Sequence, residues 1–94
     1  MDRDEATRIL ERELAAYRAE SYDGLVRRLV GESLHFERPG TGGGLYQVEI
    51  QFMWDGVPGG DVLVIGSIDD GGWRAFLPLT RSFIKGADGS FVGE

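Results

Sequence analysis

The sequence contains no cysteine and only one histidine, and these two shortages exclude several kinds of chemistry. Without cysteine the chain has no disulfide, no thiolate metal ligand and no cysteine nucleophile. Histidine is the other common zinc ligand, so a single His35 argues against a zinc site and against any mechanism that needs a histidine pair. We therefore expect neither a metal nor a cofactor.

Long apolar runs and a surplus of positive charge are also missing. No stretch approaches the roughly 18 apolar residues of a membrane-spanning helix, and residues 1–5 (MDRDE) carry charge where a signal peptide has an apolar region. We expect a cytoplasmic protein that does not bind membranes. Sixteen acidic residues against ten basic ones give a net charge of −6. Nucleic-acid binding needs a basic surface and is not expected, whereas a basic protein is a candidate partner.

The residues that are present predict a folded chain with helices first and strands later. Ninety-four residues, 41% of them hydrophobic, suffice for one domain with one core, which we assign to residues 1–94. Residues 4–19 carry apolar side chains at helical spacing from Ala6 to Tyr17, which predicts a helix with one buried side. A second, short helix is predicted from the N-cap residue Ser21 to Gly31.

From Leu34 onward apolar and polar residues alternate, which predicts strands at residues 34–38, 46–54, 62–68 and 73–79. The connection 55–61 pairs Trp54 with Val62. Asp70-Gly71 fits a two-residue type I′ turn, which pairs Ile68 with Trp73. A short hairpin is predicted around residues 83–92.

These elements predict an α+β fold, with two N-terminal helices packed on one face of a curved antiparallel four-stranded sheet and a short C-terminal hairpin. Two versions stay open. The sheet either wraps around the helix as in cystatins or forms a plain two-layer sandwich.

Three features that resemble catalytic or metal-binding motifs have simpler explanations. The run Gly40–Gly44 (GTGGG) leads into a strand rather than into a helix N-terminus, which predicts a hairpin loop and not a phosphate site. Asp55 and Asp61 flank a turn without calcium-binding spacing. His35 should point away from the core, with Glu37 or Glu49 as its neighbouring carboxylate. We assign no catalytic residue.

The predicted outer face of the sheet is unusually apolar. The expected registers gather Met53, Leu63, Ile65, Phe76 and Pro78 on the face that the helices do not cover. Contiguous apolar residues on an outward face are typical of an interface. Four possibilities stay open: a cover by the C-terminal hairpin carrying Phe83 and Phe91, a second copy of the chain in a homodimer, another partner, or plain exposure.

Two smaller sets of candidate residues complete the prediction. Asp69, Asp70 and Arg74 lie at the predicted hairpin tip, where a partner protein could contact them. Tyr46 and Trp73 would line a pocket between the helices and the sheet, and the Tyr46 hydroxyl would need a partner if it were buried.

Four segments resemble a family of short bacterial proteins without an assigned activity: residues 21–25 (SYDGL), 46–51 (YQVEIQ), 66–76 (GSIDDGGWRAF) and 88–94 (DGSFVGE). The resemblance implies a bacterial cytoplasmic origin. It supplies no activity, ligand or catalytic residue for this chain. From the residues themselves we expect a non-catalytic protein-interaction or regulatory module. A small-ligand pocket, with or without enzymatic activity, is the alternative.

Overall fold

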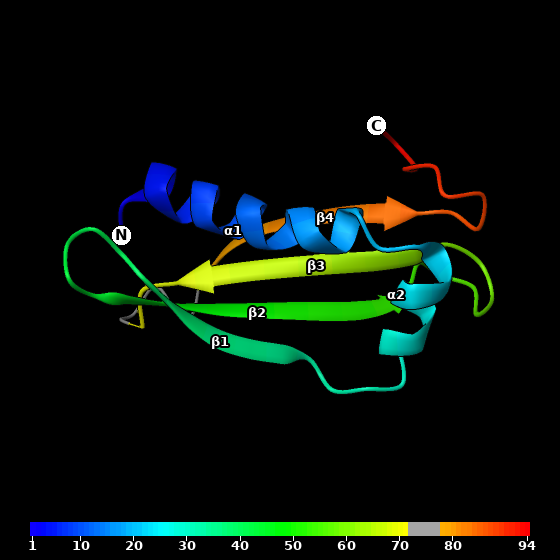
Figure 1. Cartoon of the computed structure of the whole chain (residues 1–94), viewed down its shortest axis with the longest axis horizontal. Coiled ribbons are helices and arrows are strands. Elements are labelled where there is room, and N and C mark those ends of the chain that lie inside the picture. The colour runs from blue at the N-terminus through cyan, green and yellow to red at the C-terminus, as the bar shows by residue number, and fades with distance from the viewer. Residues whose placement is uncertain (72–77) are drawn as a thin grey trace.

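The computed structural model describes residues 1–71 and 78–94, and in this part of the chain two helices precede four strands. The helices are α1 (Arg3–Arg18) and α2 (Tyr22–Arg28), and the strands are β1 (Leu34–Pro39), β2 (Leu45–Trp54), β3 (Val62–Asp69) and β4 (Leu79–Lys85). The strands form one curved, open antiparallel sheet in the order β1-β2-β3-β4, and the helices pack against it (Figure 1). The predicted α+β fold is confirmed.

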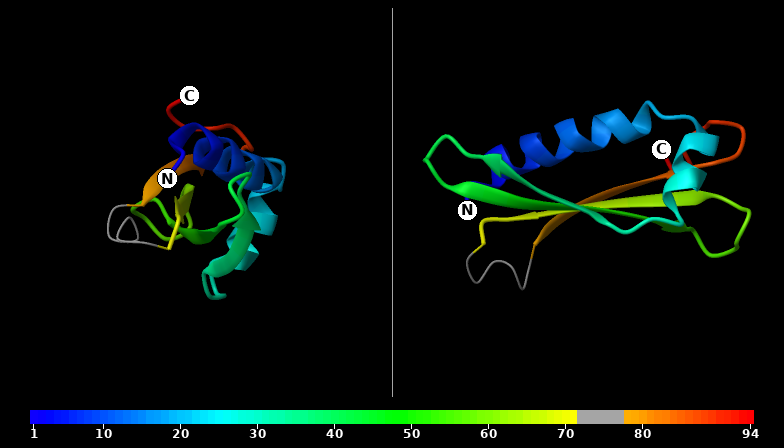
Figure 2. Two further views of the ribbon diagram at one scale, coloured as in Figure 1. Left: turned by 90° about the vertical axis from the view of Figure 1, so that its left-hand side faces the viewer. Right: turned by 60° about the horizontal axis from the view of Figure 1, so that its bottom comes forward.

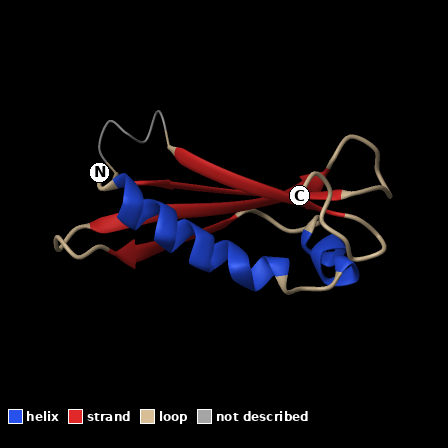
Figure 3. Cartoon of the chain, turned by 90° about the horizontal axis from the view of Figure 1, so that it is seen from above, coloured by secondary structure: helices blue, strands red, loops and turns tan. Residues whose placement is uncertain are grey.

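Helix α1 lies obliquely over one face of the sheet (Figure 3). It begins where the Asp2 side chain accepts a hydrogen bond from the Glu5 amide at 3.0 Å, a standard N-cap interaction. Ala6, Leu10 and Leu14 are fully buried, as their spacing predicts. These residues anchor the helix on the sheet, because their shared side faces the strands.

Helix α2 packs at the end of the sheet near the β2–β3 connection (Figure 1). The predicted N-cap is confirmed, since the Ser21 side chain accepts a hydrogen bond from the Gly24 amide at 3.0 Å. Leu25 is buried, and the Tyr22 hydroxyl donates to the Gly60 carbonyl at 2.6 Å. These contacts tie α2 to the β2–β3 connection.

The pairing of β2 with β3 has the predicted register. Trp54 lies opposite Val62, Phe52 opposite Val64, and Ile50 opposite Gly66. Large apolar residues on β2 alternate with polar ones, so a shift by one residue would move them to the other face of the sheet. The connection length and this alternation agree on one register.

The predicted partner of β3 is wrong. Ile68 pairs with Leu79 rather than with Trp73, and Val64 pairs with Phe83, so β4 is Leu79–Lys85 and not residues 73–79. Trp73 lies in residues 72–77, outside the described part of the chain. The shift is six positions along β4, an even number, so it does not move Leu79 to the other face of the sheet.

The turn prediction failed because Asp70-Gly71 does not form a type I′ turn. That turn requires positive φ at both central residues. Gly71 has a φ of 80°, but outside residues 72–77 no residue other than glycine has positive φ, so Asp70 does not. Instead the Asp69 side chain accepts a hydrogen bond from the Gly71 amide at 2.7 Å, which bends the chain locally.

The C-terminal hairpin forms, but it does not cover the outer face of the sheet. Lys85 bridges to Phe91, and the Val92 amide donates to the Ile84 carbonyl at 2.9 Å. Phe83 is buried in the core, and its ring meets that of Phe91 edge to face at 5.8 Å. The Arg18 guanidinium lies 4.9 Å from the Phe83 ring, so the hairpin packs at the C-terminal end of α1.

At Gly66 helix α1 packs closely on the sheet. A Cβ at this position would lie 2.8 Å from a Leu10 methyl carbon and 3.1 Å from a Leu14 methyl carbon. The middle of the helix–sheet interface is therefore packed tightly rather than hollow.

Candidate functional site

The face of the sheet that points away from the helices is built by alternate residues of the four described strands (Figure 2). Near α2 three side chains of this face form a row across neighbouring strands, because Met53 pairs with Leu63 and Leu63 pairs with Ile84. Ile65 follows two positions further along β3. We call these four side chains the apolar patch: Met53, Leu63, Ile65 and Ile84.

The apolar patch is accessible although its side chains support one another. Met53 is 37% exposed, and Leu63, Ile65 and Ile84 are half-buried. Neighbouring strands bury the base of each side chain and leave its tip outward. A soluble antiparallel sheet usually places polar residues on such a face, so these four apolar residues need an explanation.

The other end of the same face is acidic. Glu37 lies opposite Gln47, and Gln47 lies opposite Asp69. Glu49 lies in the next outward row, between His35 and Ser67, and its carboxylate lies 3.2 Å from His35 Nε2. In the strand segments that the structure describes, no outward position of this face holds lysine or arginine.

The arrangement of His35, Glu49 and Ser67 does not suit nucleophilic catalysis. The three residues lie in one row across β1, β2 and β3, with the carboxylate in the middle. A catalytic triad needs the histidine between the hydroxyl and the carboxylate. Here two strand spacings, about 10 Å, separate His35 from Ser67, so His35 does not reach the serine hydroxyl.

A pocket of about 200 Å³ lies at the acidic end of the outer face. His35, Gln47, Glu49, Ser67, Asp69 and Pro78 line it. Pro78 was predicted beside Leu63 in the apolar cluster, and this prediction is wrong, because the corrected register places Ile84 opposite Leu63. Pro78 is exposed at the opposite, polar end.

The predicted site residues therefore have mixed outcomes. The structure brings Met53, Leu63 and Ile65 together as predicted. Phe76 and Arg74 lie in residues 72–77, outside the described part of the chain. Ile84 was missed because its place depends on the β3–β4 register. Its alternation with Phe83 and Lys85 was the only signal available in the sequence.

The hairpin-tip aspartates are engaged within the chain. Asp69 is half-buried and accepts the hydrogen bond from the Gly71 amide. The Asp70 carboxylate lies 3.4 Å from the α-amine of Met1. Asp69 belongs to the acidic end of the outer face, whereas Asp70 faces the start of α1.

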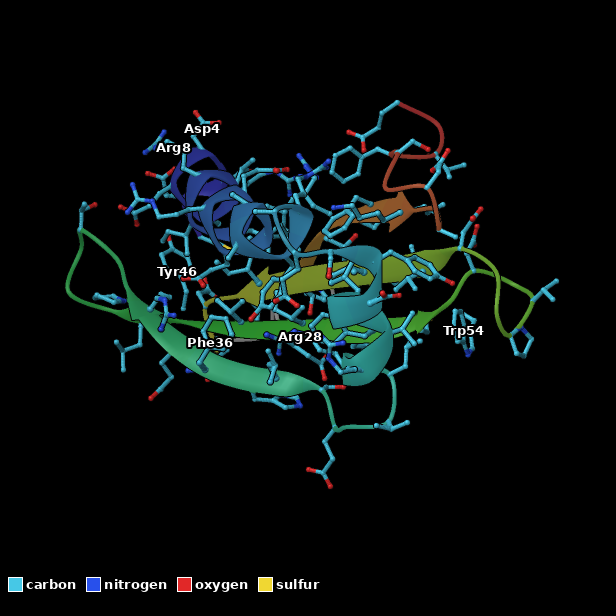
Figure 4. All side chains as sticks on the ribbon, turned by 45° about the vertical axis from the view of Figure 1, so that its right-hand side comes forward. Asp4, Arg8, Arg28, Phe36, Tyr46 and Trp54 are labelled. Atoms are coloured by element: carbon cyan, nitrogen blue, oxygen red, sulfur yellow. The ribbon has the colours of Figure 1, made fainter. Side chains whose placement is uncertain are left out.

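Tyr46, the predicted pocket residue, lies beneath the N-terminal half of α1 (Figure 4). Its hydroxyl is buried and donates to the Glu5 carboxylate at 2.9 Å. Glu5 also accepts from the Thr41 hydroxyl at 2.6 Å and from the Thr41 amide at 3.1 Å. The side chains of Glu5, Thr41 and Tyr46 thus fasten the glycine-rich β1–β2 loop to α1, and we call them the loop latch.

The loop latch shifts the pKa values of both of its ionisable members. The Thr41 hydroxyl, the Thr41 amide and the Tyr46 hydroxyl hold the pKa of Glu5 below its ordinary value. Burial, and then the hydrogen bond to Glu5, raise the pKa of Tyr46. Glu5 therefore stays ionised and Tyr46 stays protonated near neutral pH. The loop donors that a phosphate would use at Thr41 are occupied by this carboxylate.

A hollow of about 320 Å³ lies beside the loop latch, lined by Asp2, Glu5, Thr41, Leu45, Tyr46, Asp70 and three loop glycines. It opens at the end of the helix–sheet interface, not in its middle. Trp73, the other predicted pocket residue, lies outside the described residues. No buried side-chain nitrogen or oxygen in the described part of the chain lacks a hydrogen-bond partner, so no buried polar group is left for a ligand.

Neither a metal cluster nor a membrane-crossing helix occurs in residues 1–71 and 78–94. No three His, Cys, Asp or Glu side chains come together as metal ligands there. Both described helices are too short and too polar to cross a membrane. Comparisons of the chain with protein-family models, with curated proteins and with solved structures give no match. The function must therefore be argued from the surface itself.

Proposed function

We propose that this chain is a non-catalytic protein-interaction or regulatory module of the bacterial cytoplasm that binds through the outer face of its sheet. The observation that carries the proposal is the apolar patch of Met53, Leu63, Ile65 and Ile84 on a face that neither described helix covers (Figure 2). Burying such side chains against a partner releases roughly 25 cal/mol per Å² of apolar surface. The patch thus supplies the centre of an interface, with polar residues around it.

The side-chain chemistry supports binding rather than catalysis. His35 would be the candidate general base among the described residues. It pairs with Glu49, and strand β2 separates it from Ser67, the nearest outward serine. A homodimer through the same face is one form of the proposal, and a basic protein partner is another.

A small-ligand pocket is the second candidate, and the hollow beside the loop latch is the observation in its favour. The Glu5, Thr41 and Tyr46 side chains that line it already form hydrogen bonds with one another. We therefore rank ligand binding below partner binding.

Paired substitutions test whether the patch binds a protein. The patch variant is Leu63→Ser with Ile84→Ser. The control variant is Val30→Ser with Val57→Ser, because these side chains are 95% and 70% exposed and lie outside the patch. Retention of proteins from a bacterial lysate and the sedimentation of the pure chain are measured for wild type and both variants.

We expect the patch variant to lose a retained protein or a self-association that wild type and the control variant keep. Thermal unfolding of all three proteins shows that each is folded at the assay temperature. Equal retention and equal sedimentation by the three folded proteins would reject the outer face as a binding surface.

A further inference from the structure

The outer face changes character along its strands. On β3, Asp69 follows Leu63 by six positions, a distance of about 20 Å along an antiparallel strand. The apolar patch occupies one end of this distance and the carboxylates of Glu37, Glu49 and Asp69 occupy the other. A partner that covers the whole face must match both halves.

Apart from His35, which lies 3.2 Å from Glu49, the carboxylates of this face have no basic side chain of a described strand beside them. Among the described strand residues, the arginines and the lysine all lie on the helix side. Arg38 pairs with Glu13 and Arg81 with Glu11, and Lys85 donates to the Arg18 and Glu20 carbonyls. The described strands thus place their arginines and lysine on the helix side and the carboxylates of Glu37, Glu49 and Asp69 on the open side.

We propose that the occupant of the outer face is a basic, amphipathic segment of a partner protein, lying along the strands. This inference rests on the proposed function and adds the chemistry of the partner. The apolar end of the segment covers Met53, Leu63 and Ile84, and its lysines or arginines meet Glu37, Glu49 and Asp69. Opposite charges across the interface fix the direction of the segment and speed its association.

A second copy of the chain fits this face poorly. Two identical faces that stack with their ends aligned place carboxylates against carboxylates. With their ends reversed, they place carboxylates against the apolar patch. Neither arrangement brings a described strand cation to the three carboxylates, and unpaired or like charges at an interface are unfavourable.

The length of the outer face also sets the number of residues in the partner segment. A helix that spans about 20 Å needs about 13 residues at 1.5 Å per residue. An extended strand needs about six. In either form the apolar residues gather at one end of the contacting side and the cations at the other.

Two synthetic peptides test the inference. The first is an 18-residue helical peptide with four leucines on one side of its first half and four lysines on the same side of its second half. The second peptide has glutamates in place of the lysines. Binding of each labelled peptide to the full chain is measured by fluorescence anisotropy at low and at high salt.

Two variants with the same change in net charge distinguish a local contact of the peptide with the outer face from general attraction of the peptide to a negative protein. The face variant is Glu37→Gln, Glu49→Gln and Asp69→Asn. The control is Asp4→Asn, Asp23→Asn and Glu32→Gln, all exposed residues outside the strands, with Asp4 on the side of α1 that points away from the sheet (Figure 4). Each variant removes three negative charges, so the net charge changes from −6 to −3.

We expect wild type to bind the lysine peptide at least tenfold more tightly than the glutamate peptide. The face variant should lose on the order of tenfold in affinity, the combined effect of three exposed ion pairs, and the control variant less than threefold. High salt should weaken binding to wild type more than binding to the face variant.

Equal losses in the face and control variants, or equal binding of the two peptides, would overturn the basic partner. The Leu63→Ser, Ile84→Ser variant then distinguishes the two proposals. If it weakens both peptides alike, the proposed function stands and only the partner's charge is wrong. If it has no effect, the outer face is not the binding surface. A wild-type dimer that this variant dissociates would make a second copy the occupant and reject the basic segment.

Discussion

At the scale of single residues, two buried charged side chains hold the helices on the sheet. Glu5, 9% exposed, accepts three hydrogen bonds from the β1–β2 hairpin. Lys85, 8% exposed, donates to the carbonyls at the C-terminal end of α1 at 2.9 and 2.6 Å. Both ends of α1 are thus fixed by a strand or a hairpin through charge-assisted hydrogen bonds.

The loop latch predicts a pH dependence of stability. Because folding lowers the pKa of Glu5 from its ordinary value of 4.5, its stabilising effect is complete above that value and is lost as the pH falls through the folded-state pKa. We expect Glu5→Gln to unfold at a lower temperature than wild type at pH 7, and this difference to shrink below pH 4.5. Thermal unfolding followed by circular dichroism measures it.

Thr41→Val is the control for this pH dependence, since it removes the hydrogen bond that lowers the pKa of Glu5 most. In this variant the acid-induced loss of stability should begin at a higher pH than in wild type. A constant difference in unfolding temperature between Glu5→Gln and wild type from pH 7 to pH 3 would contradict the role of Glu5.

Lys85 and Arg81, both on β4, test how burial changes the contribution of a charged side chain to the free energy of unfolding. Lys85→Met leaves two carbonyls at the end of α1 without their donor and should cost about 1.5–3 kcal/mol in the free energy of unfolding. Arg81 lies 3.6 Å from Glu11, with both side chains 45% exposed. Arg81→Met should cost less than about 1 kcal/mol. Urea denaturation measures both, and equal costs would contradict this reading.

At the scale of secondary-structure elements, the β2–β3 hairpin could be predicted with its register and β4 could not. On β2 the apolar residues that face the helices alternate with polar ones, so the sequence alone contains the signal. On β4 two of the helix-facing residues are Arg81 and Lys85, whose partners lie on α1. Only the tertiary structure explains why these two charged residues face the helices. The sequence of β4 therefore lacks the alternation from which a strand is predicted.

For the same reason, some residues of the candidate site could be predicted from the sequence and others could not. Met53, Leu63 and Ile65 follow from the β2–β3 register and were predicted. Ile84 depends on β4 and was missed, and Pro78 was placed at the wrong end for the same reason. The loop latch joins residues 36 and 41 positions apart in the chain, and no local pattern connects them.

The packing of α1 on β3 gives a prediction at Gly66. In Gly66→Ala the new methyl group would lie within 3.4 Å of Leu10, Leu14 and Ile50, all fully buried. We expect a loss of about 1–3 kcal/mol in the free energy of unfolding, typical of an overpacked core. The matched control is Gly44→Ala, where no atom lies within 4 Å of the added Cβ. This change should be neutral or stabilise by up to about 1 kcal/mol.

Chemical denaturation of the two glycine variants measures the difference. A Gly66→Ala protein as stable as Gly44→Ala would show that α1 lies further from the sheet than the described contacts require.

At the scale of the whole molecule, the sheet separates two environments. The helix side holds the core together with the paired cations of the strands, whereas the open side carries an apolar end and an acidic end. The net charge of −6 gives the molecule a negative field that attracts cationic partners from any direction. In the proposed function, the apolar patch restricts binding to one face.

The central claim, that the open side of the sheet is the binding surface, can be tested residue by residue. The chain is labelled with ¹⁵N and titrated with the leucine–lysine peptide, and the backbone amide shifts are recorded. We predict that the largest shifts occur at the outward residues of β2, β3 and β4 around Met53, Leu63 and Ile84, and extend to Glu49 and Asp69. Largest shifts on α1 and α2, with the open face unchanged, would contradict the claim.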